Sequence, residues 1–499
     1  MQNLYFASVF IVATCGLVYE LVAGALASYL LGDSVTQFST IIGCYLFAMG
    51  VGSYFSKYVQ RNLLLFFVKV EILIGIVGGF SAVLLFLVFD YVSSFRLILY
   101  TVVFIIGMLV GIEIPLIMRI LKDELEFKDL VSKIFTFDYI GALLASVLFP
   151  LVMVPHLGLV RTALFFGLLN VGVAFLTLVY FQKKMNWSKS LLGSSIVAFM
   201  ALFIAFIYGN RLTEWVEAMS YGDKVVYSHS TSYQKILLTQ SNNEMKLFLN
   251  GNLQFSSRDE YRYHESLVHP GLAAVKNPKH ILIFGGGDGL AAREILKYPS
   301  VETITLVDLD KKMTELFSQN EFLTKLNHES ILSPKLKVIN QDAFLWIKDN
   351  PNKYDFIVVD FPDPTNFSLG KLYSLSFYRN LYSLLTEDGY AVVQSTSPFV
   401  ARKSFWCINE TLNEAGFSTA PYHSYVPSFG EWGYTIAGHR PYHLPEALPA
   451  GLRFVSMETL PGFFQFPADM SALEVEPNKL NNQNLVKYFE NEWAPYATH

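Results

Sequence analysis

Acidic side chains follow the ends of several predicted strands in the second half of the chain. Asp288 lies in a glycine-rich turn after the apolar run HILIF, and Asp308 follows the run TITLV. Asp360 and Asp363 stand three residues apart at the end of the run DFIVVD. The carboxyl ends of parallel strands meet at one edge of a sheet, where such sheets bind ligands. Grouped carboxylates attract positive charge, and one of them can accept a proton from an attacking amine, so the pattern indicates a cationic substrate.

A nucleoside site is predicted at the same edge. The run 285–289 (GGGDG) allows the backbone to approach a ligand closely, although tight strand–helix turns also use glycine. Asp308 follows it by about 20 residues, the position of an acid that accepts hydrogen bonds from ribose hydroxyls. Asp342 and Ala343 come after the third strand and suit the adenine edge. A phosphate-binding lysine of the GxxxxGKS kind is missing from the turn, which favours a nucleoside over a nucleoside triphosphate.

The elements that must position these residues alternate in type. From His280 the runs HILIF, TITLV, LKVIN, DFIVVD, YAVVQS and YTIAG are separated by helical segments, which predicts a doubly wound parallel sheet within 271–445. Before it, the alternating runs KVVYSHS, QKILLTQ and MKLFLNG predict a small antiparallel β-sheet within 225–270. The tail 446–499 carries one predicted helix near Asn484–Trp493.

The first half of the chain has the composition of a membrane domain. Hydrophobic residues make up 52% of the 499 residues and charged residues only 16%, whereas soluble chains carry about a quarter charged residues. A spanning helix needs about 20 apolar residues. Seven stretches of that length predict a transmembrane helical domain over 1–208, followed by an amphipathic linker at 209–224. The stretches are Tyr5–Leu31, Phe38–Phe55, Leu63–Phe89, Leu97–Met118, Ile134–Val154, Ala163–Phe181 and Leu191–Ile207.

Four acids fall inside these predicted spans: Glu20, Glu71, Glu113 and Asp138. Ionisable groups at such depth are costly and suggest a function. One interpretation is a cation route or an amine-binding pocket between the helices. The other is that protonated or paired carboxyls only hold the helices together.

Charge and cysteine content exclude other classes. The net charge of −5 gives no electrostatic basis for a nucleic-acid partner. Two of the three cysteines lie in apolar runs and the third stands alone, so neither a disulfide framework nor a zinc site is expected. Lys and Arg gather in the loops after the second, fourth and sixth spans, which predicts that those loops are cytoplasmic and the C-terminal half is not.

The stretch from about Val225 to Gly438 resembles spermidine synthase, and the whole chain resembles the multi-pass membrane-fused form of that family. The likeness rests on GGGDG at 285–289, VDLD at 307–310, QDA at 341–343 and DFPDP at 360–364. The upstream run NGNLQFSSRDEYRYHE at 250–265 also matches the family pattern. The resemblance implies a Rossmann-like, methyltransferase-type α/β domain that transfers the aminopropyl group of decarboxylated S-adenosylmethionine to an amine, with putrescine as the default acceptor.

The same resemblance implies roles for individual residues. Asp360 would be catalytic, orienting and deprotonating the attacking nitrogen. The co-substrate decarboxylated S-adenosylmethionine would be bound by Gln234, Gly285, Gly287, Asp288, Asp308, Asp342 and Ala343. The acceptor channel would be lined by Gln254, Tyr263, His264 and Asp363, with Asp288 holding the amino group of the aminopropyl arm. No permanently bound cofactor and no metal is expected, because the sulfonium is already an activated leaving group.

Some positions depart from the family pattern. Asp308 stands where the family usually has Glu, and Thr365-Asn366-Phe367 replaces a usual Gly-Pro. Phe429 replaces the usual Tyr of the acceptor loop, which removes a hydroxyl from the predicted amine pocket.

Two other functions remain open from the sequence. One is a polyamine-binding sensor or transporter whose C-terminal domain is regulatory. The other is an adenosylmethionine-dependent methyltransferase, which the retention of Asp288 and of both acids at 360–363 disfavours. The expected partners are a small cationic amine and the lipid bilayer of the cell (inner) membrane, with a homodimer by resemblance only. Because decarboxylated adenosylmethionine is made inside cells, a cytoplasmic catalytic face is favoured, against the lysine and arginine count.

Overall fold

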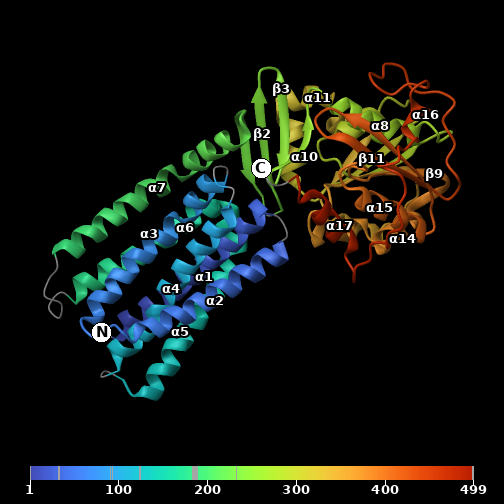
Figure 1. The fold of residues 1–499 in the computed structure, drawn as a ribbon. Coiled ribbons are helices and arrows are strands. Elements are labelled where there is room, and N and C mark those ends of the chain that lie inside the picture. Colours follow the sequence, from blue (N-terminus) through green and yellow to red (C-terminus); the bar gives the residue numbers. More distant parts are fainter. Residues whose placement is uncertain are drawn as a thin grey trace. The chain divides into compact units, whose positions relative to one another are not determined.

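The computed structural model describes residues 2–31, 34–89, 92, 94–122, 125–181, 189–231 and 233–496 (Figure 1). The side chains of residues 2–5, 34, 210 and 212–220 lie outside this description. The chain forms two compact units, one up to residue 232 and the other from 233 to 498. Each unit has its own hydrophobic core.

The first unit consists of long apolar helices. They are α1 (Gln2–Leu31), α2 (Ser34–Ser56), α3 (Leu63–Phe89), α4 (Phe95–Leu121), α5 (Phe127–Leu148), α6 (Val154–Tyr180) and α7 (Lys189–Tyr221), with the π-turn η1 (Phe149–Met153) and the strand β1 (Lys224–Ser230). Within the described residues, six helical segments have the length and composition to cross a membrane. The count is six because α5, η1 and α6 form one segment, 127–180, in which the sequence predicts two spans.

A kink divides this segment. Pro150 and Pro155 lie in it, and Gly158 adopts a left-handed φ of 71°. Proline removes a helical hydrogen bond, and a left-handed residue breaks the helical path. Both α5 and α6 contact α1, so the two parts lie against the same helix.

Most of the linker predicted at 209–224 is helical. Residues 209–221 continue α7 without a break, so the last apolar stretch and the expected linker form a single helix. The segment contains no proline, and helix propagation costs little once a helix has formed. The amphipathic character predicted for this linker concerns side chains that lie mostly outside the described part of the structure.

The second unit begins with an antiparallel ladder and continues as an α/β domain. The ladder consists of β2 (Lys235–Ser241), β3 (Glu244–Leu249) and β4 (Asn252–Ser256), and α8 (Glu260–Leu272) follows it. The main-sheet strands are β5 (His280–Gly285), β6 (Thr303–Val307), β7 (Leu336–Ile339), β8 (Tyr354–Asp360), β9 (Leu385–Gln394), β10 (Ser418–Val426) and β11 (Gly430–Gly438). The larger helices between and after them are α9 (Leu290–Ile295), α10 (Lys311–Gln319), α11 (Glu321–Leu326), α12 (Ala343–Asp349), α14 (Leu375–Leu384), α15 (Arg402–Glu414) and α17 (Asn484–Trp493). Shorter elements are η2 (Ser330–Leu332), α13 (Phe367–Gly370), η3 (Lys371–Tyr373) and α16 (Leu460–Phe463).

The main sheet has the strand order β10-β11-β9-β8-β5-β6-β7. The strands β5 to β9 are parallel, as their alternation with helices predicts. The last two strands differ from the prediction of a wholly parallel sheet, because β11 is antiparallel to both β9 and β10. A short loop joins β10 to β11, and a parallel connection would need a long crossover.

Alternate residues of the central strands pack on opposite faces of the sheet. Phe284 and Val359 belong to one core, whereas Ile283 and Val358 belong to the other. Burial on both faces is the reason that these strands are continuous apolar runs. The cores fix the strand ends, and the polar turns that follow them carry the candidate site.

Candidate active site

The glycine-rich turn after β5 has a backbone that only glycine adopts easily. Gly285 and Gly289 have φ angles of 76° and 75°. A Cβ at Gly285 would come within 2.1 Å of the carbonyl oxygen of Asp360, and one at Gly287 within 2.6 Å of Oδ2 of Asp308. The glycines therefore let the turn pack directly against two of the predicted site acids. Within the turn, Asp288 is 8% exposed and its Oδ1 accepts the backbone N–H of Leu290 at 2.8 Å.

Asp308 is fixed by the turn that follows β6. Its Oδ2 accepts the N–H of Gly287 at 3.1 Å, and its Oδ1 accepts the N–H of Asp310 at 2.8 Å. The amide of Gln234 donates to Oδ2 of Asp310 at 3.2 Å, so this predicted residue reaches the same turn. Burial raises the pKa of Asp308 to about 7, with the charges of Asp310 and Asp288 adding to the effect.

Asp360, the last residue of β8, meets a side chain from α8. The hydroxyl of Tyr263 donates to Oδ1 of Asp360 at 2.5 Å. Burial raises the pKa of Asp360 to about 6, and the charge of Asp288 acts in the same direction. His264 and the hydrogen bond from Tyr263 oppose this rise. Asp288 and Asp360 therefore lie close enough for each to disfavour ionisation of the other, which suits a site completed by a cationic ligand.

His264 is held by a buried ion-pair network. Its Nδ1 lies 2.8 Å from Oε2 of Glu260, and Arg293 binds both oxygens of Glu260 at 2.8 and 2.9 Å. Burial lowers the pKa of His264, but Glu260, Asp288 and Asp360 together raise it above its usual value. The network fixes the ring of His264 close enough to Asp288 and Asp360 for their charges to favour its charged form.

Replacing Arg293 with Met is expected to destabilise the second unit by about 3–5 kcal/mol. The change would leave two buried carboxylates, Glu260 and Glu294, without their shared partner. Thermal unfolding of the full chain should show a Tm lower by roughly 10 °C. Lys297→Met is the matched control, because Lys297 pairs with Glu294 but is 27% exposed. Equal Tm losses in the two variants would contradict a dominant role for Arg293.

Asp363 lies beside polar groups from β9 and η3. Gln394 donates to Oδ1 of Asp363 at 3.2 Å and to the carbonyl of Phe361 at 2.7 Å. Its amide also reaches the hydroxyl of Tyr373 at 2.8 Å. Burial raises the pKa of Asp363 to about 6, while the hydrogen bond from Gln394 lowers it. These contacts fix the DFPDP turn after β8.

Two predicted residues have other contacts in this structure. Asp342 caps α12 and forms an ion pair with Lys371 at 2.7 Å, next to the buried Ala343. Gln254, on β4, donates only to neighbouring backbone carbonyls, those of Asn252 and Leu253, in the hydrogen bonds described. The structure therefore groups Asp288, Asp308, Asp360, Tyr263 and His264, and it does not bring Gln254 into contact with them.

Phe429 occupies an anchored loop between β10 and β11. Its ring centroid lies 6.0 Å from that of Tyr263 and 5.1 Å from that of Trp432. The neighbouring Ser428 donates its N–H and its hydroxyl to the carboxylate of Asp259 at 2.7 and 2.9 Å. The loop thus places an aromatic ring, without a hydroxyl, beside the Tyr263–Asp360 pair.

Several supporting residues are not among the predicted site residues. They are Asp259, Glu260, Arg293, Asp310, Lys371, Tyr373 and Gln394. Glu260 and Asp259 lie in the quoted run 250–265, and Gln394 ends the run YAVVQS, so their positions are visible in the sequence. Arg293 and Lys371 have no motif of their own. In the described ranges, no group of three or more His, Cys, Asp or Glu side chains is arranged to hold a metal ion.

Comparison with known proteins gives consistent matches. The family model of the spermine/spermidine synthase domain matches residues 260–444. The polyamine aminopropyltransferase of Leptospira interrogans is 51% identical over 99% of this chain and 99% of its own length. Polyamine aminopropyltransferase 2 of Ralstonia nicotianae is 51% identical over 97% of each chain. Polyamine aminopropyltransferase 1 of Streptomyces coelicolor is 39% identical over 98% of this chain and 94% of its own.

The α/β sheet and the family match define the second unit as a transferase domain of the spermine/spermidine synthase class. These relatives cover the helical unit as well as the catalytic one. The chain therefore belongs to the polyamine aminopropyltransferase family, and it is an enzyme that transfers aminopropyl groups.

Proposed function

We propose that the enzyme transfers the aminopropyl group of decarboxylated S-adenosylmethionine to a diamine or polyamine, with putrescine as the default acceptor. The observation that carries this proposal is the short hydrogen bond from Tyr263 to Asp360, next to Asp288 and His264. A half-buried carboxylate with a pKa of about 6 is ionised at neutral pH and still able to accept a proton.

The proposed step is one in-line displacement. The lone pair of the acceptor nitrogen forms the new N–C bond while the bond between the same carbon and the sulfonium sulfur breaks. Its electron pair stays on sulfur and yields methylthioadenosine. The nitrogen gives up one proton, which Asp360 accepts. Holding both substrates at the sheet edge would supply much of the acceleration, since proximity and orientation can contribute about 7–11 kcal/mol.

The other predicted residues receive supporting roles in this proposal. Asp308 would accept hydrogen bonds from the ribose hydroxyls, and Gln234 would hold the neighbouring Asp310 in place. Asp288 would bind the amino group of the aminopropyl arm. Asp342 and Ala343 would meet the adenine, in which case Asp342 would exchange part of its ion pair with Lys371 for a hydrogen bond to the base.

A mass-spectrometric assay tests the proposal. The purified full-length protein is incubated with decarboxylated adenosylmethionine and a panel of amines of increasing length. Methylthioadenosine and one aminopropylated amine should appear together in equal amounts. If no amine gives a product, while intact adenosylmethionine gives a methylated one, the methyltransferase interpretation replaces the proposal.

The acid limb of the pH profile should report Asp360. With a pKa of about 6, kcat/KM should fall roughly tenfold per pH unit below that value and level off above it, because only the carboxylate accepts the proton. The hydrogen bond from Tyr263 lowers this pKa, so Tyr263→Phe should move the limb to higher pH. Tyr434→Phe is the control, since that hydroxyl donates to the backbone of Tyr263 and not to Asp360. An unmoved limb in Tyr263→Phe would show that another group sets the profile.

We also propose that the helical unit lies in the cell membrane. Its surface exposes large apolar side chains, among them Leu46, Phe47, Leu97, Leu143 and Val197 at 58–69%, whereas Glu71, Glu113 and Asn170 are buried. Soluble proteins rarely expose extended apolar surface of this kind, and lipid would cover it. Polar groups that face inward are typical of membrane helices.

The catalytic unit is proposed to face the cytoplasm, where its adenosyl co-substrate is made. The lysine and arginine distribution predicts the opposite face. Reporter fusions at His499 distinguish the two orientations. For a cytoplasmic catalytic unit, fused green fluorescent protein should fluoresce and fused alkaline phosphatase should stay inactive. If the alkaline phosphatase fusion is active and the green fluorescent protein fusion does not fluoresce, the catalytic unit lies on the outer side of the membrane.

A further inference from the structure

Two carboxyl groups from different helices meet in the interior of the helical unit. Glu71 on α3 is 0% exposed and Glu113 on α4 is 1% exposed. The two side chains hydrogen-bond with each other. An ionised carboxylate only accepts hydrogen bonds, so this bond exists only when a proton lies on one of the pair.

Polar groups from two more helices complete the cluster. Asn170 on α6 donates to Oε2 of Glu71 at 2.7 Å, and the hydroxyl of Tyr19 on α1 donates to Asn170 at 3.0 Å. Both residues are fully buried. Apart from the contact between the two carboxyl groups, Oε1 of Glu71 and Oε1 of Glu113 have no hydrogen-bond partner among the described residues. A proton on the pair supplies a donor that these buried oxygens otherwise lack.

Among the described residues, the charged groups that act most strongly on the pair are acidic. Asp138 on α5 and Glu71 both act on Glu113, and both are acidic. The other titratable groups facing the pair are Cys15 and Tyr19 on α1 and Tyr45 on α2, with Glu20 also close to Tyr45. Two carboxylates in contact in a low-dielectric interior cannot both be ionised. The pair must hold a cation, and a proton is the one that the direct carboxyl–carboxyl contact accommodates.

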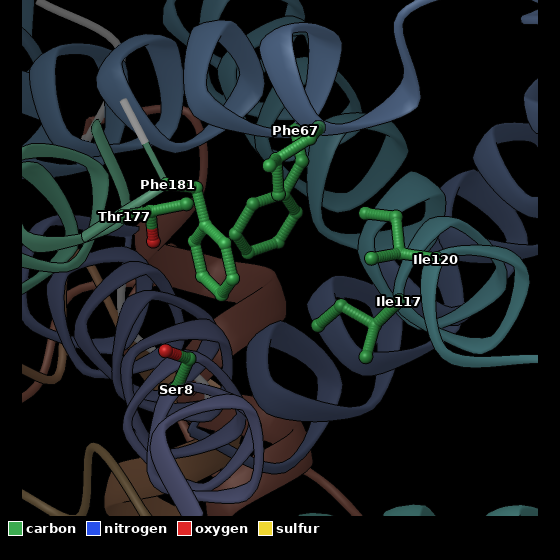
Figure 2. Close-up of a pocket in the computed structure, with 7 residues that line it drawn as sticks. Ser8, Phe67, Ile117, Ile120, Thr177 and Phe181 are labelled. Carbon is green, nitrogen blue, oxygen red and sulfur yellow. The ribbon is translucent and has the colours of Figure 1, made fainter. Parts of the chain in front are cut away.

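A water-sized cavity lies further along the same four helices. Ser8, Phe67, Ile117, Ile120 and Thr177 line it, and Figure 2 shows their side chains converging on one space from α1, α3, α4 and α6. Phe67 stands one helical turn before Glu71, and Ile117 one turn after Glu113. The cavity volume of about 10 Å³ holds about one water molecule, which is too small for a polyamine.

We infer that Glu71 and Glu113 form a proton-binding site inside the helical unit, which exchanges its proton with water through this cavity. The site is independent of the aminopropyl transfer assigned to the other unit. It gives the helical unit a proton-linked role, with Asn170 and Tyr19 as positioning residues for Glu71. Gly78 permits this arrangement, because a Cβ there would come within 2.6 Å of the ring of Tyr19.

Infrared spectroscopy of the full-length protein in lipid nanodiscs tests the inference. At neutral pH the unmodified protein should show a carbonyl band of a protonated carboxyl that shifts in D₂O. The Glu71→Gln/Glu113→Gln double variant should lose this band, and each single variant should move it. Glu20→Gln is the matched control, since Glu20 is buried in the same unit and the hydrogen bonds described for the pair do not include it. It should leave the band of the pair in place. Retained methylthioadenosine release and an unchanged gel-filtration profile identify folded variants.

Three results would overturn the inference. The first is a spectrum of the unmodified protein without such a band, which needs no variant to fold. The second is a band that persists in a folded double variant. The third is a band that disappears when NaCl is added at constant pH, which would assign the site to sodium. For the cavity, Ile120→Phe should slow deuterium exchange of the band several-fold, and an unchanged rate would show that water reaches the pair elsewhere.

Discussion

Replacing Asp360 with Asn should lower kcat by about 10²–10⁴-fold, the usual contribution of a positioned general base. The amide is nearly isosteric and cannot accept the proton of the attacking amine. It can still meet the hydroxyl of Tyr263, so the strand end and its hydrogen bond should survive. Methylthioadenosine release under saturating co-substrate and amine is the measurement. The KM for decarboxylated adenosylmethionine should change little.

The matched control for this variant is Asp388→Asn. Asp388 is a 79% exposed acid paired with Arg440, far from the strand ends that carry the site. Its substitution removes the same charge from the same unit, and kcat should stay within a factor of about two, because exposed ion pairs contribute little. If Asp360→Asn keeps more than a tenth of the activity, the proton acceptor is another group or water.

Replacing Asp288 with Asn should reduce kcat/KM for decarboxylated adenosylmethionine by about 10–100-fold. A hydrogen bond to a charged group contributes about 1.5–3 kcal/mol, and each 1.4 kcal/mol is a factor of ten. The amide can still accept the N–H of Leu290, which keeps the turn after β5 in place. Competition by intact adenosylmethionine, whose carboxylate Asp288 should repel, is expected to strengthen in the variant.

Asp310→Asn is the comparison for this second variant. Asp310 is buried at the neighbouring turn and caps α10. Replacing it therefore affects stability and the position of the ribose, but not recognition of the aminopropyl arm. It should leave the ratio of affinities for decarboxylated and intact adenosylmethionine unchanged. An unchanged ratio in Asp288→Asn would contradict the role proposed for that carboxylate.

The approximate architecture follows from periodicity. Apolar runs separated by helical segments predict the parallel strands β5 to β9, because a strand buried on both faces needs few polar residues. The order of β10 and β11 does not follow from the same pattern. Whether a final apolar run is parallel or antiparallel depends on the length of the connection and on which edge is open, and Pro421 within β10 obscures its pattern.

The order of residues along the chain is enough to place three acids at one edge of the sheet. Asp288, Asp308 and Asp360 each follow a strand, and parallel strands bring their carboxyl ends together whatever the details of packing. The long apolar helices follow from the sequence as well, because runs of about 20 apolar residues are typical of helices long enough to span a membrane.

The contacts between side chains, in contrast, could not be predicted from the sequence and depend on how the elements pack. Tyr263 precedes Asp360 by 97 residues, Arg293 follows Glu260 by 33, and Glu71 and Glu113 stand on separate helices. Such contacts depend on the angle of α8 against the sheet, on the crossing of α3 with α4 and on side-chain rotamers. Local sequence patterns set which face of a helix or strand a residue occupies. The packing of the whole core sets how closely two elements approach, and a hydrogen bond forms only when that approach brings donor and acceptor atoms within about 3 Å.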